Sequence, residues 1–201
     1  PGSSTLKAKQ METCGKCHAN EVTNFKNSAH GKAYLSGDIK DAPSCTSCHG
    51  EHNISSVAST EKFSKINTSD MCLTCHKDGK PTKDAKNNSD SLATGYHLSV
   101  HYVALKDGNT NSASCADCHG AHEMKPSNDP TSKTNIKNIA NTCGVSDCHP
   151  KQKEQYTGSI HQTAVEKDSK DAPTCVNCHG NHQIARRDKN IDKNIASKSV
   201  V

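Results

Sequence analysis

The sequence has few of the residues from which an ordinary hydrophobic core is built. Only 31% of its 201 residues are hydrophobic, 3% are aromatic, and tryptophan is absent. Globular domains usually draw about 45–50% of their residues from the apolar types, and chains far below that share tend to stay disordered. No stretch approaches the roughly 18–20 apolar residues of a membrane span. We therefore expect no membrane span, and something other than apolar side chains has to fill the core.

A strong excess of one charge is also missing, because 25 Lys and Arg against 21 Asp and Glu leave a formal net charge of +4. Small basic clusters occur at Lys151 and Lys153 and at Arg186 and Arg187. The sequence contains no basic stripe interleaved with aromatic residues, on which a nucleic acid would stack. Nucleic acid is therefore not an expected partner.

Cysteine and histidine, by contrast, are abundant, with 12 and 13 copies. All the cysteines fall in six motifs in which the second cysteine is followed at once by histidine. Five motifs have two residues between the cysteines, and one has four. The six motifs are Cys14/Cys17/His18, Cys45/Cys48/His49, Cys72/Cys75/His76, Cys115/Cys118/His119, Cys143/Cys148/His149 and Cys175/Cys178/His179.

This pattern is the attachment signature of c-type haem. The two thiols bind the haem vinyl groups covalently, and the adjacent histidine binds the iron from one side. Disulfides, or three zinc sites assembled from the Cys-x-x-Cys pairs, are the alternatives, but neither needs a histidine after every second cysteine. We expect six covalently attached haem c groups, the fifth in chain order having two extra residues looped out between Cys143 and Cys148.

Six haems would supply the missing core, with about 33 residues of chain to wrap each of them. The expected fold class is therefore mostly irregular with a few short α-helices, an elongated haem-cored row and almost no β-structure. Hydrophobic spacing and bounding glycines predict a helix over 96–106, with His97 and His101 on one face. Further short helices are expected over 19–29, 133–142, 150–157 and 158–166, and surface loops over 77–91 and 125–132.

The chain also repeats internally. The segments 40–52 and 170–182 are identical at 9 of 13 positions, and 114–122 is a shorter copy. The repeating unit is a haem motif, a Ser-x-His, a second haem motif and a Gly-x-His. We expect one domain, 1–201, built of three two-haem repeats at about 14–52, 72–122 and 143–182. The tail, 183–201, lies beyond the last repeat and is a candidate for contact with another subunit.

Six of the seven histidines outside the haem motifs fall in register with this repeat. Because bis-histidine iron needs one further imidazole per haem, these six are the candidate distal ligands. His97 lacks the Ser-x-His context, so we expect it in solvent or beside a ligand, with the alternative that it replaces His101. The candidate distal ligands are His30, His52, His101, His122, His161 and His182.

The short spacing within Cys-His-Gly-x-His limits which iron each distal histidine can reach. His52 lies three residues after His49, within about 10 Å along the chain, so it cannot cross to the far face of the same haem. Our hypothesis is that the two haems of each repeat exchange distal ligands. In that scheme His52, His122 and His182 serve the first haem of each repeat, and His30, His101 and His161 the second. A swapped scheme and ligation of a neighbouring subunit's haem are the alternatives.

Filling both axial positions leaves no open iron for substrate, so the expected function is electron transfer rather than catalysis. The doubled motif with its Ser-x-His and Cys-His-Gly-x-His resembles multihaem cytochromes c of respiratory and extracellular electron transfer, including decahaem conduits and filament-forming cytochromes. The resemblance covers roughly 14–182. It implies redox donor and acceptor proteins or extracellular acceptors as partners, and a homopolymer filament as one form of assembly. Export to the periplasm or the cell exterior, with a removed signal peptide, is also expected.

The alternatives to a filament subunit are a soluble monomeric shuttle and, from the enzyme class, a multihaem reductase with one open haem.

Overall fold

The computed structural model describes residues 6–58, 60–77, 90–169 and 171–185, and the side chains of 90 and 91 are not described. The described chain consists of short helices joined by turns and loops, without a β-strand, which confirms the expected fold class. Most of the loop expected over 77–91 and of the tail expected over 183–201 lies outside the described residues.

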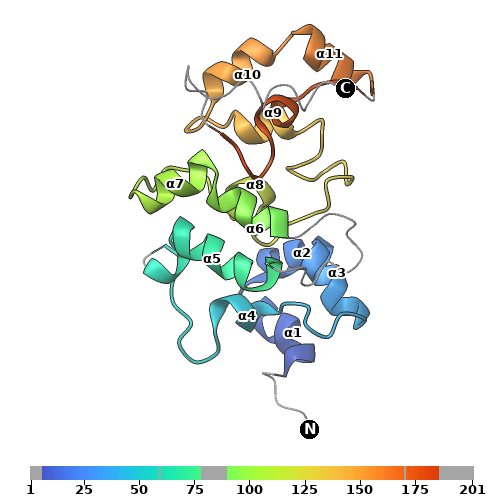
Figure 1. Cartoon of the computed structure of the whole chain (residues 1–201). Helices are drawn as coiled ribbons and strands as arrows, with labels where there is room; N and C mark the ends of the chain where they lie inside the picture. Colours follow the sequence, from blue (N-terminus) through green and yellow to red (C-terminus); the bar gives the residue numbers. More distant parts are fainter. Residues whose placement is uncertain (1–5, 59, 78–89, 170, 186–201) are drawn as a thin grey trace.

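The helices repeat in groups of four, one group for each sequence repeat, and the groups are stacked in three tiers along the molecule (Figure 1). In each group the first helix enters a haem motif, the second precedes the Ser-x-His, the third carries its histidine, and the fourth is the second haem motif. The groups are α1 (Gln10–Gly15), α2 (Ala19–Asn27), α3 (Ala29–Ser36) and α4 (Cys45–His49); α5 (Lys65–His76), α6 (Asp90–His97), α7 (Val100–Lys106) and α8 (Cys115–His119); and α9 (Ile139–Cys143), α10 (Pro150–Tyr156), α11 (Ile160–Glu166) and α12 (Cys175–His179). Two 3₁₀ turns, Lys7–Lys9 and Glu61–Phe63, precede α1 and α5.

The serine of each Ser-x-His separates two helices and caps the second. Ser99 is extended, with ψ 152°, and its Oγ accepts a hydrogen bond from the Tyr102 amide at 3.2 Å. A serine oxygen at this position satisfies one of the free amides that begin a helix. The single helix expected over 96–106 is therefore wrong. The chain forms α6 and α7, and His97 and His101 lie on different helices.

The other Ser-x-His segments repeat this geometry. Ser28 and Ser159 are extended in the same way, and they cap α3 and α11 through the amides of Gly31 and Gln162. Ser28 and Ser99 are among the most buried side chains of the described chain. The helices expected over 19–29, 150–157 and 158–166 are found as α2, α10 and α11, and only the end of 133–142 is helical, as α9.

The second haem motif of each repeat is a helix of about one turn held by a capping box. The residue before the first cysteine caps the helix. The side chain of the residue just before the second cysteine accepts a hydrogen bond from the backbone amide of that capping residue, as Asp117 Oδ2 does from the Ser114 amide at 2.7 Å. Each helix ends at a glycine of positive φ, between 80° and 85°, which only glycine adopts at low cost. These glycines are Gly50, Gly120 and Gly180.

Few apolar side chains are buried in the described chain. They lie on several of the helices and, as Ala42 and Ala172, in loops, and the side chains with less than 2% exposure are three serines, Ser28, Ser69 and Ser99. Tyr96 joins α5, α6 and the start of α8, because its hydroxyl donates to the Ala113 carbonyl at 2.9 Å and lies 3.2 Å from Ser69 Oγ. The described polypeptide thus has little core of its own, as its composition predicts.

Candidate haem-binding sites

Each Cys-x-x-Cys-His motif lies on or at the end of a helix, which places both thiols on one side of the chain and the histidine directly after them. The stretched motif reaches the same result by another path. His149 has φ −126° and ψ 50°, close to the −112° and 51° of His18 in the first motif, and both residues cap the helix that follows. The two extra residues are taken up in a turn, with the Cys148 amide donating to the Val145 carbonyl at 3.0 Å. The fifth motif histidine, His149, is therefore placed like the first, His18.

All 12 cysteines and 13 histidines lie in the described part of the chain. Within that part, no group of three or more His, Cys, Asp or Glu side chains is arranged to hold a metal ion directly. A zinc ribbon would need four such ligands around one point.

Eight histidines face one another in four pairs, each pair made of one motif histidine and one candidate distal histidine. The two stacked pairs have interplanar angles of 16° and 6°, and the other two are tilted. The distances between ring centroids are 5.9 Å for His76 and His30, 5.9 Å for His49 and His122, 6.2 Å for His149 and His101, and 6.1 Å for His119 and His182.

These separations fit an iron atom bound between the two rings. Imidazole–metal bonds of about 2 Å on both sides, plus a ring radius of about 1.2 Å for each imidazole, give about 6 Å between centroids. The paired rings lie beside the cysteines that would bind the haem, so the residues present fit a bis-histidine c-type haem at each pair. Their role as ligands remains a prediction from this geometry.

The pairs join different repeats, so the within-repeat exchange expected from the spacing is wrong for these four histidine pairs. His30 and His101, from the Ser-x-His segments, face the first haem motif of the following repeat. His122 and His182, from the Gly-x-His segments, face the second haem motif of the preceding repeat. Each boundary between repeats is therefore crossed by two histidine pairs.

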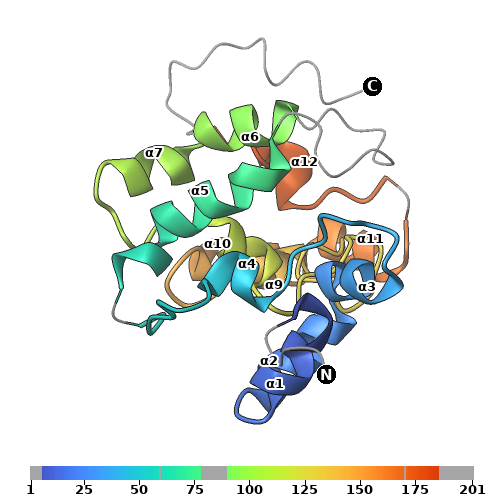
Figure 2. The same ribbon diagram turned by 90° about the horizontal axis from the view of Figure 1, so that it is seen from below.

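Packing between the tiers explains this exchange. The Ala29 amide donates to the Met124 carbonyl at 2.7 Å, and the Val100 amide donates to the Ile184 carbonyl at 2.9 Å. Each bond ties a Ser-x-His segment to the segment just after the Gly-x-His of the next repeat. A Cβ built on Gly95 of α6 would lie 3.4 Å from His182 Cβ, so the segment just after α12 reaches α6. Seen from below, α12 and α6 accordingly overlap in the view (Figure 2).

Burial lowers the pKa of six of the eight paired imidazoles, which favours the neutral form that binds a metal. Burial, and to a smaller extent the facing His182, lowers the pKa of His119 to about 4. Burial likewise lowers the pKa of His30 and of His101, with a further contribution from the histidine that each faces. These side chains can therefore bind iron across the physiological pH range.

The thiols of successive motifs lie side by side. Hydrogen bonding between Cys72 and Cys115 raises the pKa of the first and lowers that of the second to about 7. A hydrogen bond between Cys143 and Cys175 likewise raises the pKa of Cys143 and lowers that of Cys175 to about 6. For three further thiols burial is the main cause of a raised pKa, and a thiol of the neighbouring motif adds to it. That neighbour is Cys14 for Cys45, Cys75 for Cys48 and Cys148 for Cys118.

The five thiol pairs connect the six motifs in one row that follows the order of the sequence. Within a repeat the first cysteines of its two motifs are hydrogen-bonded, and between repeats cysteines of the adjoining motifs lie near enough for the charge of one to raise the pKa of the other. The attachment sites of neighbouring haems are therefore adjacent from the first motif to the last.

Five histidines face no other imidazole in the described chain. His97 packs instead on the ring of Tyr102, with 4.4 Å between centroids, so the structure places His101 rather than His97 opposite a motif histidine. The other four are exposed: His18, His52, His161 and His179.

Two neighbours of His49 had no role in the sequence analysis. Phe63 lies against its ring at 5.2 Å, and Lys62 Nζ donates to its backbone carbonyl at 2.9 Å. Both belong to the 3₁₀ turn before α5, and no repeat signal distinguishes them in the sequence.

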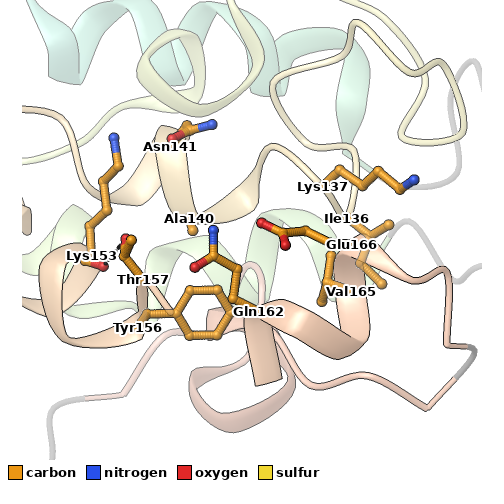
Figure 3. A pocket seen from close by; sticks show the side chains of 10 residues that line it. All are labelled: Ile136, Lys137, Ala140, Asn141, Lys153, Tyr156, Thr157, Gln162, Val165 and Glu166. Carbon is orange, nitrogen blue, oxygen red and sulfur yellow. Dashed lines mark hydrogen bonds between the residues drawn. The ribbon is translucent and has the colours of Figure 1, made fainter. Parts of the chain in front are cut away.

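A pocket of the described chain with a volume of about 90 Å³ lies away from these histidines. It opens between α9, α10 and α11, where Tyr156, Gln162 and Glu166 point into it, and none of its lining residues is cysteine or histidine (Figure 3). Its lining therefore offers no haem ligand, and the ligand candidates all lie outside it.

A family model described as a doubled CXXCH motif matches residues 38–81, which hold the second and third haem motifs. Comparison with curated proteins and with solved structures gave no significant match. The doubled motif implies covalently bound c-type haem and indicates a multihaem c-type cytochrome, a class of protein involved in electron transfer. Among the described residues, no helix combines the length and the apolar character needed to cross a membrane.

Proposed function

We propose that the chain carries electrons along six c-type haems, each of which is bound through two cysteines and the histidine that follows them. The observation that carries this proposal is the set of four facing imidazole pairs, separated by 5.9–6.2 Å. Haem bound in this way supplies a one-electron iron couple with no site left for substrate. The protein is accordingly an electron carrier and not an enzyme.

The order of the thiol contacts supports a conduit rather than six independent carriers. Because neighbouring attachment sites lie near one another from the first motif to the last, an electron entering at one end meets a carrier at every step. The partners are redox donor and acceptor proteins or extracellular acceptors. The conduit works in periplasmic or extracellular respiration, where c-type haem is attached, and it is a subunit of a cytochrome filament.

Two other functions make different predictions. A soluble monomeric shuttle would use the same six haems but would remain a single chain at all concentrations. A multihaem reductase is favoured by one observation, namely that His18 and His179 face no imidazole in the described chain. In that case the iron at one of them would bind and reduce a small substrate such as nitrite or hydroxylamine.

Purified holoprotein separates these candidates. A redox titration followed by the visible haem bands should show reversible reduction of all haems at low potential, as bis-histidine ligation predicts. Reduced protein should pass its electrons to a ferric chelate but should not turn over nitrite or hydroxylamine. Steady turnover of either substrate would contradict the electron-conduit function and support the reductase. Purified protein without haem absorption would contradict both functions.

A further inference from the structure

Apart from His97, which packs on Tyr102, four histidines remain unused after the four pairs are formed, and they lie in the first and last repeats. His18 and His179 are motif histidines without a facing ring, and His52 and His161 are candidate distal ligands without a facing motif. All four are exposed, whereas seven of the eight paired histidines are partly buried. The two motif histidines that lack a distal ligand are therefore matched in number by two candidate distal ligands that lack a motif histidine. The first repeat and the last repeat each hold one of both kinds.

The contacts at the two internal boundaries between repeats show how these four histidines would pair. Across a boundary, the Ser-x-His of the earlier repeat faces the first motif of the later one, and the Gly-x-His of the later repeat faces the second motif of the earlier one. A boundary after the third repeat would thus need the first repeat of another copy. It would bring His161 to the next copy's His18, and the next copy's His52 to His179.

The backbone contacts and apolar side chains at the boundaries extend in the same way. Ile160 occupies the position of Ala29 and Val100, and Ile54 occupies that of Met124 and Ile184, the residues hydrogen-bonded across the internal boundaries. The internal four are partly buried. Ile160 and Ile54 are instead the two most exposed large hydrophobic side chains of the described chain, at 82% and 63%. Burying both would recover apolar surface that the isolated chain leaves in water.

The thiols point to the same continuation. At both internal boundaries the second cysteines of two motifs lie near enough for the charge of one to raise the pKa of the other, as Cys75 does for Cys48 and Cys148 does for Cys118. The second cysteines without such a neighbour are Cys178 and Cys17, at the two ends of the row. Their meeting across a boundary between copies would continue the row of attachment sites without a gap.

We infer that the occupant of each exposed end is a second copy of this chain, joined head to tail by two exchanged axial ligands. His161 of one copy binds the iron held by the next copy's His18, and the next copy's His52 binds the iron held by His179. This inference rests on the proposed haem-binding function. Because α11 lies at the opposite end of the molecule from α1 and α4, repeated joining extends an open filament rather than closing a dimer (Figure 1).

Substitution of the two surplus histidines tests the inference on holoprotein. His161→Ala and His52→Ala should each shorten or abolish filaments in negative-stain images, and should each turn at least one haem in about six from low-spin to high-spin. His97→Ala is the matched control, because His97 packs on Tyr102 and faces no motif histidine. It should leave both the filaments and the spin state unchanged.

Mixing the two variants gives the sharpest outcome. The His52→Ala chain keeps an intact C-terminal end and the His161→Ala chain keeps an intact N-terminal end, so together they form one complete boundary. The mixture should yield discrete dimers by analytical ultracentrifugation, with low-spin haem regained at that boundary. Longer chains should be absent, since the opposite junction would lack both histidines.

Three results would overturn the inference while leaving the proposed function standing. They are wild-type protein that stays monomeric with six low-spin haems, a closed ring of fixed size, and a variant mixture that forms no dimer. Failure of the proposed function has a different signature, because a chain without haem shows no haem absorption in any of these samples.

Discussion

Removing the imidazole of His122 would show which repeat supplies each axial ligand. Its ring centroid lies 5.9 Å from that of His49, with the two ring planes 16° apart, although His122 belongs to the second repeat and follows the motif of Cys115 and Cys118. His122→Ala should therefore open the haem held by His49. One iron in about six, or roughly 17% of the total, should become high-spin and bind carbon monoxide when reduced. The fold should survive, because His122 lies in a bend and not in a helix.

Two background variants decide which haem has lost its ligand. In a chain that lacks the second haem through Cys45→Ala and Cys48→Ala, His122→Ala should produce no further high-spin iron. In a chain that lacks the third haem through Cys72→Ala and Cys75→Ala, it should still produce one. The assay is low-temperature electron paramagnetic resonance, with carbon monoxide difference spectra of the reduced protein. The reverse pattern would refute ligand exchange between repeats and restore exchange within them.

Three other perturbations have definite expected outcomes. Gly31→Ala should destabilise the protein by about 2–3 kcal/mol in thermal unfolding followed by circular dichroism, because the new Cβ would meet the Phe25 carbonyl oxygen at 1.7 Å, whereas Gly15→Ala should be close to neutral. Tyr96→Phe should cost about 1 kcal/mol at pH 8 through its lost hydrogen bond to Ala113. Burial raises the pKa of Tyr96 from 10.0 to about 12, so the wild type should lose further stability as pH rises from 10 to 12, and the variant should lose less. Prolonged treatment with a zinc chelator should leave the fold unchanged, and unfolding by the chelator would favour the zinc alternative.

The sequence predicts the ligand types but leaves the partner of each ligand open. Every facing pair in the structure consists of one motif histidine and one histidine from the Ser-x-His or Gly-x-His positions, as the repeat indicates. The spacing shows only that His52 cannot reach the iron of His49. Exchange within a repeat and exchange between repeats both satisfy that condition, and the choice depends on packing such as the bond from the Ala29 amide to the Met124 carbonyl.

The helices, too, were only partly predictable from local sequence signals. Apolar periodicity over 96–106 suggests one helix, yet Ser99 prefers to cap a new helix and divides the segment at 98–99. The serine signal is present in the sequence three times, at each Ser-x-His, and could have corrected the expectation. The one-turn helices at α4, α8 and α12 have no periodicity to reveal them and depend on their capping boxes.

The number of covalently bound haems tests the central claim most directly. The intact mass of the purified, denatured holoprotein should equal the mass of the chain plus six haems, including one on the stretched motif of Cys143 and Cys148. A mass with five haems would break the row of attachment sites and the symmetry between repeats. A mass with none would contradict the account as a whole.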